Sequence, residues 1–247
     1  VDQLVGILTS QDQRYLSDGY IVTDNGRYLG LGTGDQLVRA VTETRIEAAR
    51  HANPLTFLPG NIPISLHIQR LLESGTEFVA CYADLNNFKP FNDHYGYWRG
   101  DQMIRLVARL ATAHCDARSD FVGHVGGDDF MLIFQSSNWL QRCKNIVDEF
   151  AREAVTLFDD SARLAGGIHA EDRHGVQRFF PCTTLAIGAV RITPGRFRYA
   201  EEVANLAAVA KHEAKQASTG VVLHGGFTES SLGAVAATRA LQDVLAA

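Results

Sequence analysis

The sequence lacks the features of a disulfide-rich, zinc-binding or membrane-spanning protein. Its four cysteines form no CxxC pair, which argues against a disulfide or zinc framework and fits a reducing compartment. No apolar run is long enough to cross a bilayer, so we expect no direct membrane insertion. The chain starts at Val1 with neither an initiator methionine nor a signal-like segment. We therefore expect a piece of a longer, cytoplasmic protein.

The sequence also lacks an excess of positive charge. Its 23 Lys and Arg face 28 Asp and Glu, which gives a net charge of −5. This balance argues against nucleic acid or an anionic membrane as a partner, because both require a basic face. A phosphorylated small molecule stays possible, since a few lysines and a metal ion can neutralise phosphates locally. The length of 247 residues and the 46% hydrophobic content predict one large globular domain, alone or with a small second one.

The first 52 residues predict a small strand–strand–helix segment. Two apolar runs flank Asn25-Gly26, a strong hairpin signal, and a helical pattern follows over residues 36–51 with Asp35 as its expected cap. The segment is too small for a core of its own. Its hairpin loosely resembles the end of a CBS-type sensory module, and an N-terminal extension packed on the main domain is the alternative. Prolines at 54, 59 and 63 then indicate a rigid boundary, so the main domain is expected over residues 53–247.

The main domain alternates helices with strands. Residues 78–84 form an apolar run without alternation, typical of a strand buried on both faces, and Asp84 ends it. Two further apolar runs flank Gly126-Gly127 and predict a hairpin. Helices are expected at 64–73, 102–114, 139–158, 199–217 and 232–247, a polar loop or exposed hairpin at 166–178, and strands at 179–192 and 221–223. This order predicts an α+β or α/β sandwich with a mixed sheet.

Two adjacent carboxylates, Asp128 and Asp129, lie at the predicted hairpin tip. Carboxylates close together repel each other, and a metal ion would relieve the repulsion. In a mixed sheet the end of the strand at Asp84 could lie beside this tip. We therefore expect Asp84, Asp128 and Asp129 around one Mg²⁺-binding point, with Lys89 and Lys215 supplying positive charge to phosphates.

Several separate motifs then resemble the GGDEF domain of diguanylate cyclases. They lie in the expected order over residues 53–223: LTFLPGN at 55–61, DLNNFKPFND at 84–93, Gly96 with Gly100-Asp101, GGDDF at 126–130, TLAIG at 184–188, and Ala214-Lys215. The resemblance implies a palm-like βααββαβ core with a mixed or antiparallel sheet flanked by helices, as in nucleotidyl cyclases. It implies synthesis of cyclic di-GMP from two GTP by two facing subunits, hence a bacterial signalling homodimer.

The resemblance also implies roles for individual residues. Asp84, the Leu85 carbonyl and Asp128 would hold Mg²⁺ or Mn²⁺, and Asp128 would be the candidate base for the 3′-hydroxyl. Asn92 and Asp101 would read the guanine edge, and Lys89 and Lys215 would hold phosphates. The remaining expected site residues belong to the same motifs: Phe88, Gly126 and Gly127 on the substrate side, and Asp129 on the catalytic side.

The sequence departs from the family pattern where charge matters. Asp129 replaces Glu, Asn86 replaces Asp, His124 replaces Arg, Tyr97 replaces His and Thr219 replaces Arg. The RxxD product-inhibition motif would need Arg at Ala117, although Asp120 is in place, so feedback binding there is not expected. These departures leave a second hypothesis open: a catalytically impaired domain that binds GTP or cyclic di-GMP and regulates an attached phosphodiesterase or other module.

Overall fold

The structure is a computed structural model that describes residues 19–171, 175–217 and 220–225. By its internal contacts the chain divides into two compact units, Val1–Ala52 and Asn53–Ala247. In the first unit an antiparallel hairpin precedes one helix; the elements are β1 (Tyr20–Asp24), β2 (Arg27–Gly32) and α3 (Gly34–Arg50). The cap of α3 is Thr33, whose hydroxyl accepts from Gln36 N, so the expected Asp35 cap is wrong; Asp35 lies in the first turn instead.

The second unit is built on a five-stranded sheet with strand order β4-β5-β3-β8-β9. All its pairs are antiparallel except β8 with β9, which confirms the predicted mixed sheet. The strands are β3 (Phe78–Asn86), β4 (Phe121–Gly126), β5 (Asp129–Phe134), β8 (Thr184–Ile192) and β9 (Val221–Leu223). The helices are α4 (Asn61–Glu73), α5 (Phe88–Tyr95), α6 (Tyr97–His114), α7 (Trp139–Ala154), α8 (Asp160–Ala165) and α9 (Ala200–Gln216). The order β3-α5-α6-β4-β5-α7-β8 is the expected βααββαβ core.

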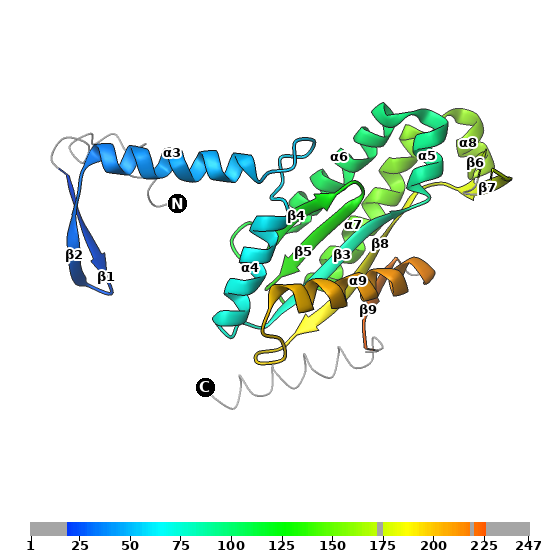
Figure 1. The fold of residues 1–247 in the computed structure, drawn as a ribbon. Coiled ribbons are helices and arrows are strands. Elements are labelled where there is room, and N and C mark those ends of the chain that lie inside the picture. The colour runs from blue at the N-terminus through cyan, green and yellow to red at the C-terminus, as the bar shows by residue number, and fades with distance from the viewer. Residues whose placement is uncertain (1–18, 172–174, 218–219, 226–247) are drawn as a thin grey trace. The chain divides into compact units, whose positions relative to one another are not determined.

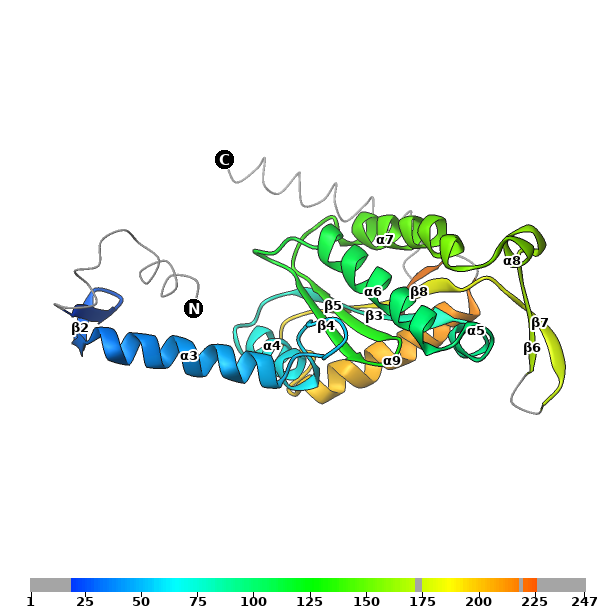
Figure 2. The same ribbon diagram turned by 90° about the horizontal axis from the view of Figure 1, so that it is seen from above.

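Helices cover both faces of the sheet (Figure 1), and each face has its own apolar core. Figure 2 shows α6 and α7 on one side and α4 and α9 on the other. Because side chains alternate along a strand, even-numbered β3 residues such as Ala80 join the core under α4 and α9, and odd-numbered ones such as Cys81 join the other. The even parity places Asp84 on the α9 side. On β5 the same holds for Met131 and Ile133, and hence for Asp129.

Helix α9 lies unusually close to the sheet. Its buried side chains facing the sheet are mostly alanines, and Gly188 of β8 lies directly beneath it. A Cβ atom on Gly188 would be 2.1 Å from the backbone of Ala210, so only glycine permits this approach. The lysines on this helix are therefore held at a fixed and short distance from the end of β3.

Several predicted boundaries were wrong for identifiable reasons. The segment after Asp84 contains an extra helix, α5. Helix α6 begins at Tyr97 and not at residue 102 as expected, so Asp101 lies inside it. The single strand expected over residues 179–192 is two, since β7 (Gln177–Pro181) pairs with β6 (Gly167–Glu171) as a separate hairpin. The helix expected over 139–158 ends at Ala154 and a 3₁₀ turn, Val155–Leu157, follows. The helix expected at 232–247 falls outside the described residues. Within the described ranges, no helix combines the length and the hydropathy that a bilayer crossing requires.

Candidate active site

Asp84 is the buried acidic group at the centre of the site. It is 4% exposed and lies near the end of β3, the central strand, whose alternation directs it toward α9. Lys215 Nζ lies 2.7 Å from Asp84 Oδ1, and Lys211 Nζ lies 3.1 Å from Asp84 Oδ2. Oδ1 nevertheless accepts no well-directed hydrogen bond from any described residue. The carboxylate is thus held by charge and keeps a lone pair for another ligand.

Asp128 is the second carboxylate, and it belongs to the turn that joins β4 to β5. The turn residues are Gly127 and Asp128, one position later than the sequence pattern predicts. Burial raises the pKa of Asp128 to about 6, and both a hydrogen bond with Asp84 and repulsion by its charge add to the rise. A carboxyl group whose pKa is raised by a second carboxylate beside it marks a site that a divalent cation would stabilise.

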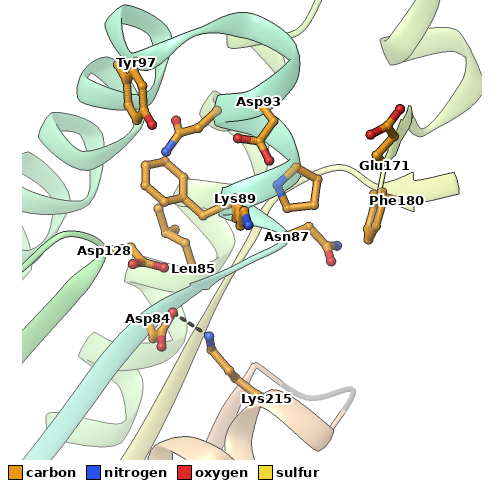
Figure 3. Close-up of a pocket in the computed structure, with 13 residues that line it drawn as sticks. Asp84, Leu85, Asn87, Lys89, Asp93, Tyr97, Asp128, Glu171, Phe180 and Lys215 are labelled. Atoms are coloured by element: carbon orange, nitrogen blue, oxygen red, sulfur yellow. Dashed lines mark ion pairs between the residues drawn. The ribbon is translucent and has the colours of Figure 1, made fainter. Parts of the chain in front are cut away.

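These two carboxylates open onto a pocket of about 680 Å³ (Figure 3). Seven of the expected site residues line it: Asp84, Leu85, Phe88, Lys89, Asn92, Asp128 and Lys215. Tyr97, which replaces the family histidine, lines the pocket as well. Five further residues line it that were not expected in the site: Asn87, Pro90, Asp93, Glu171 and Phe180. Glu171 and Phe180 come from the β6–β7 hairpin. The sequence suggested only an exposed loop or hairpin around Glu171, and it placed Phe180 in the strand expected over residues 179–192. Four expected residues do not line the pocket: Asp101, Asp129, Gly126 and Gly127.

The wall of the pocket also contains Asn92 of α5. Its Oδ1 atom is buried and accepts no hydrogen bond from the described residues. Gly100 of α6 packs against this amide, and a Cβ atom there would lie 1.9 Å from Asn92 Oδ1. The glycine is needed for this close approach. Asp101, the next residue on α6, does not line the pocket. An unpaired buried amide is costly unless a ligand satisfies it.

Lysine is concentrated at this site. The chain has only four lysines, of which Lys89 and Lys215 line the pocket and Lys211 contacts Asp84, while Lys144 lies on α7. Lys211 was missed by the sequence reasoning. A usable signal existed, because Lys211 and Lys215 are four residues apart and therefore share one face of α9.

Asp129 does not face the pocket. Its strand parity directs it toward α9, where it accepts a hydrogen bond from Lys211 Nζ at 2.8 Å. Burial alone would lower the pKa of Lys211, but this hydrogen bond and the charge of Asp84 raise it, so Lys211 stays protonated. The expected cluster of three carboxylates is thus a pair, Asp84 and Asp128, plus a third that is already occupied by an ammonium group.

His124 holds the turn between β4 and β5 in place through a hydrogen bond to the backbone. Its ring stacks on Phe130 with centroids 4.3 Å apart, and its Nε2 lies 2.9 Å from the carbonyl oxygen of Gly127. A carbonyl oxygen can only accept, so Nε2 carries the hydrogen, and in the neutral ring Nδ1 accepts from the Thr56 hydroxyl at 2.9 Å. His124 is 2% exposed, and burial lowers its pKa. The turn around Gly126 and Gly127 leaves open space, since added Cβ atoms there would meet nothing within 4 Å.

The donor set fits a hard divalent cation bound together with a substrate. Within the described ranges no cluster of three or more His, Cys, Asp or Glu side chains has metal-binding geometry. The chain therefore offers two carboxylates and the backbone at Leu85, too few for a closed protein cage. Mg²⁺ is usually bound in this way, by one or two carboxylates with water and substrate phosphates.

Comparisons with known proteins agree with this arrangement. The family model described as "Diguanylate cyclase, GGDEF domain" matches residues 50–220. Among solved structures, the coiled coil and GGDEF domain of DgcB from Caulobacter crescentus, in complex with c-di-GMP, superposes with a TM-score of 0.55 at 21% identity, over 75% of this chain and 93% of that one. The diguanylate cyclase SiaD from Pseudomonas aeruginosa, in complex with its activator SiaC, gives 0.56 at 19% identity, over 76% and 67%. At these identities the structures show the shared fold alone.

Curated relatives match shorter segments. The bifunctional diguanylate cyclase/cyclic di-GMP phosphodiesterase MucR of Pseudomonas aeruginosa is 34% identical over 104 residues, 40% of this chain and 15% of MucR. The diguanylate cyclase VdcA of Vibrio cholerae is 34% identical over 64 residues, 26% of this chain and 18% of VdcA. The matched part is therefore a small fraction of each relative's length.

Proposed function

Since this chain belongs to the family of diguanylate cyclase GGDEF domains, we propose that it is a Mg²⁺-dependent diguanylate cyclase. It would condense two GTP molecules into cyclic di-GMP with release of two pyrophosphates. The observation that carries this proposal is that Asp84 and Asp128 line one pocket together with Lys89, Lys215 and Asn92, whose buried Oδ1 atom accepts no hydrogen bond from the described residues. That pocket combines a cation site, positive charge for phosphates and a polar end for a base.

The residues of the pocket would have separate roles in binding the metal ion, the phosphates and the base. Asp84, the Leu85 carbonyl and Asp128 would hold Mg²⁺ or Mn²⁺, which supplies positive charge to the triphosphate when bound. Lys89 and Lys215 would bind the phosphates, and Asn92, with Asp101 behind it, would hydrogen-bond the guanine edge. In the reaction, the 3′-oxygen of one nucleotide forms a bond to the α-phosphorus of the other, and the bond from that phosphorus to the pyrophosphate oxygen breaks. Asp128 would accept the 3′-hydroxyl proton.

The reaction requires two copies of the chain. Each pocket would hold one GTP, and two pockets must face each other so that each 3′-hydroxyl reaches the other α-phosphate. We therefore propose that the active species is a homodimer, in the cytoplasm of a bacterium and within a larger signalling protein. In that protein residues 1–52 would transmit a signal, as the end of a CBS-like module or as an extension of the catalytic domain.

The deciding experiment supplies the purified chain with GTP and Mg²⁺ and measures cyclic di-GMP by chromatography. Product should form faster per chain as the protein concentration rises, because dimers are required. ATP should not replace GTP. Product no greater than that of an Asp128→Asn control would overturn the cyclase proposal.

A second candidate function rests on the Lys211–Asp129 ion pair and the shortened Asp129 side chain. In this alternative the domain is catalytically impaired, binds GTP or cyclic di-GMP, and regulates an attached phosphodiesterase or other module. Some relatives favour it, since the cyclic di-GMP phosphodiesterase PdeB of Shewanella oneidensis is 42% identical over 55 residues. Calorimetry separates the two: GTP binding without turnover supports the regulatory domain, and the absence of nucleotide binding rejects both.

A further inference from the structure

Lys211 occupies the interior of the acidic cluster. Its ammonium nitrogen lies 3.1 Å from Asp84 Oδ2 and 2.8 Å from Asp129 Oδ1, so it bridges two carboxylates that belong to neighbouring strands. It also lies 4.5 Å above the centre of the Tyr82 ring, which attracts cations. The side chain is 22% exposed, so water reaches it poorly. These contacts describe a cation-binding position that is filled by the chain itself.

Rigid elements hold Lys211 in this position. Ala210 and Ala214 on either side of it are fully buried, and Gly188 allows α9 to approach the sheet at Ala210. Asp84 and Asp129 point to the same face by strand parity, on the adjacent strands β3 and β5. Lys215, one turn later, contacts the other oxygen of Asp84. Each of the two lysines therefore contacts one oxygen of Asp84, and of the two only Lys211 also contacts Asp129.

We propose that Lys211 is a resident cation that takes the position between Asp84 and Asp129 which a second divalent ion would otherwise occupy. This inference rests on the proposed function, in which a metal ion binds at Asp84 and Asp128. Under it the site takes one divalent ion, and Asp129 serves as the anchor of Lys211 and is not a metal ligand. The role of Lys211 is to position charge: it neutralises Asp129 and one oxygen of Asp84, and leaves Asp128 for the metal.

The competing explanation is that Lys211 only fills the site in the absence of metal. In that case a divalent ion would displace the ammonium group, Asp129 would become a ligand, and two ions would bind. The two explanations differ in the number of ions per chain and in the effect of removing the charge, and neither measurement depends on turnover.

The test is a Mn²⁺ titration of the full chain in the presence of a GTP analogue with a non-cleavable α,β-methylene bridge, with free Mn²⁺ followed by electron paramagnetic resonance. We expect one ion per chain in the wild type. Lys211→Met keeps a side chain of similar length without the charge, and it should bind a second ion or bind the first about tenfold more tightly, because one positive charge is removed from the carboxylates. Lys211→Arg keeps the charge and should remain at one ion. Lys144→Met removes the same charge from α7 and serves as the matched control.

A second variant keeps the test independent of any folding defect in Lys211→Met. Asp129→Asn should leave the count at one ion, because Asp129 is not a ligand under this inference. Two ions in the wild type, a loss of Mn²⁺ binding in Asp129→Asn, or wild-type binding by Lys211→Met would each overturn the inference while leaving the cyclase proposal intact. If neither the wild type nor Lys211→Met takes up any Mn²⁺ with the analogue, both proposals fail.

Discussion

The two ends of the β4–β5 hairpin carry acidic residues in opposite circumstances. At the open end, the Asp120 carboxylate accepts hydrogen bonds from Asp116 N, Gln135 N, Ser136 N and the Ser136 hydroxyl at 2.9–3.1 Å. At the tip, Asp128 faces Asp84, and burial together with the neighbouring Asp84 raises the pKa of Asp128. Donors of the chain itself satisfy the Asp120 carboxylate. Asp128 instead lies beside a second carboxylate, an arrangement that a bound cation would stabilise. Sequence alone presents both as aspartates beside a turn, so the difference is one of available donors.

This comparison bears on the incomplete RxxD motif. Asp120 is the motif's surviving residue, and its oxygens are committed to the backbone that joins the hairpin to its neighbours. Ala117 stands where the motif has Arg, and the Asp120 carboxylate already accepts hydrogen bonds from the chain. For this reason we still predict that no product binds there.

The largest expected effect is at the tip. Asp128→Asn should reduce cyclic di-GMP synthesis by about 100-fold or more, because the variant loses a metal ligand and the proton acceptor. Its stability to urea at pH 7 should not fall, since the substitution removes repulsion with Asp84. Turnover and urea unfolding on the same preparation check both parts. A variant that loses stability while keeping its turnover would show that Asp128, like Asp120, has a structural role and not a catalytic one.

The next effect belongs to the open end. Asp120→Ala should cost about 2–4 kcal/mol of unfolding free energy, because backbone N–H groups at three positions lose a charged acceptor. Turnover per folded molecule should stay near that of the wild type. Urea denaturation measures the loss, with Asp148→Ala on the exposed face of α7 as control. A change under 1 kcal/mol would mean that water replaces the carboxylate and that Asp120 is not structural.

The positions of the main site residues follow from the sequence to a useful extent. The strand ending near Asp84, the hairpin at Gly126-Gly127 and the residues of the pocket's acidic end were all predicted, because apolar runs and glycines mark them. Three things were not. Helix α5 is short and polar, so its period was hidden. The start of α6 was expected at residue 102, because nothing local shows that this helix begins at Tyr97. Lys211 resembles any solvated lysine until strand parity and the approach of α9 are known.

Asn92 extends the comparison to another part of the pocket wall, where a buried amide oxygen accepts no hydrogen bond from any residue that the structure describes. Asn92→Ala should weaken GTP binding about tenfold, since one well-placed hydrogen bond to the base is worth about 1 kcal/mol or slightly more. The selectivity for GTP over ATP should fall together with the affinity. Calorimetric titration of the variant with each nucleotide checks this, and an unchanged GTP affinity would show that the base binds elsewhere.

The smallest expected effect concerns His124, which supports the tip through the Gly127 carbonyl. Burial lowers the pKa of His124, while the charge of Asp129 and the Gly127 carbonyl oppose this shift. A histidine with a lowered pKa in the folded state prefers to be neutral there. It contributes fully to stability above its ordinary value of about 6.5, and this contribution is lost as the pH falls below that value. Wild-type unfolding free energy should therefore decline below pH 6.5 by about 1 kcal/mol per pH unit or less from this group.

His124→Gln isolates that contribution, because glutamine can donate to the Gly127 carbonyl but does not titrate. The variant should start less stable at pH 7.5, since the stacking on Phe130 is lost, and should decline less steeply between pH 6.5 and 5. Urea unfolding at several pH values gives the two slopes. Equal slopes would mean that protonation of His124 does not affect the stability of the hairpin tip.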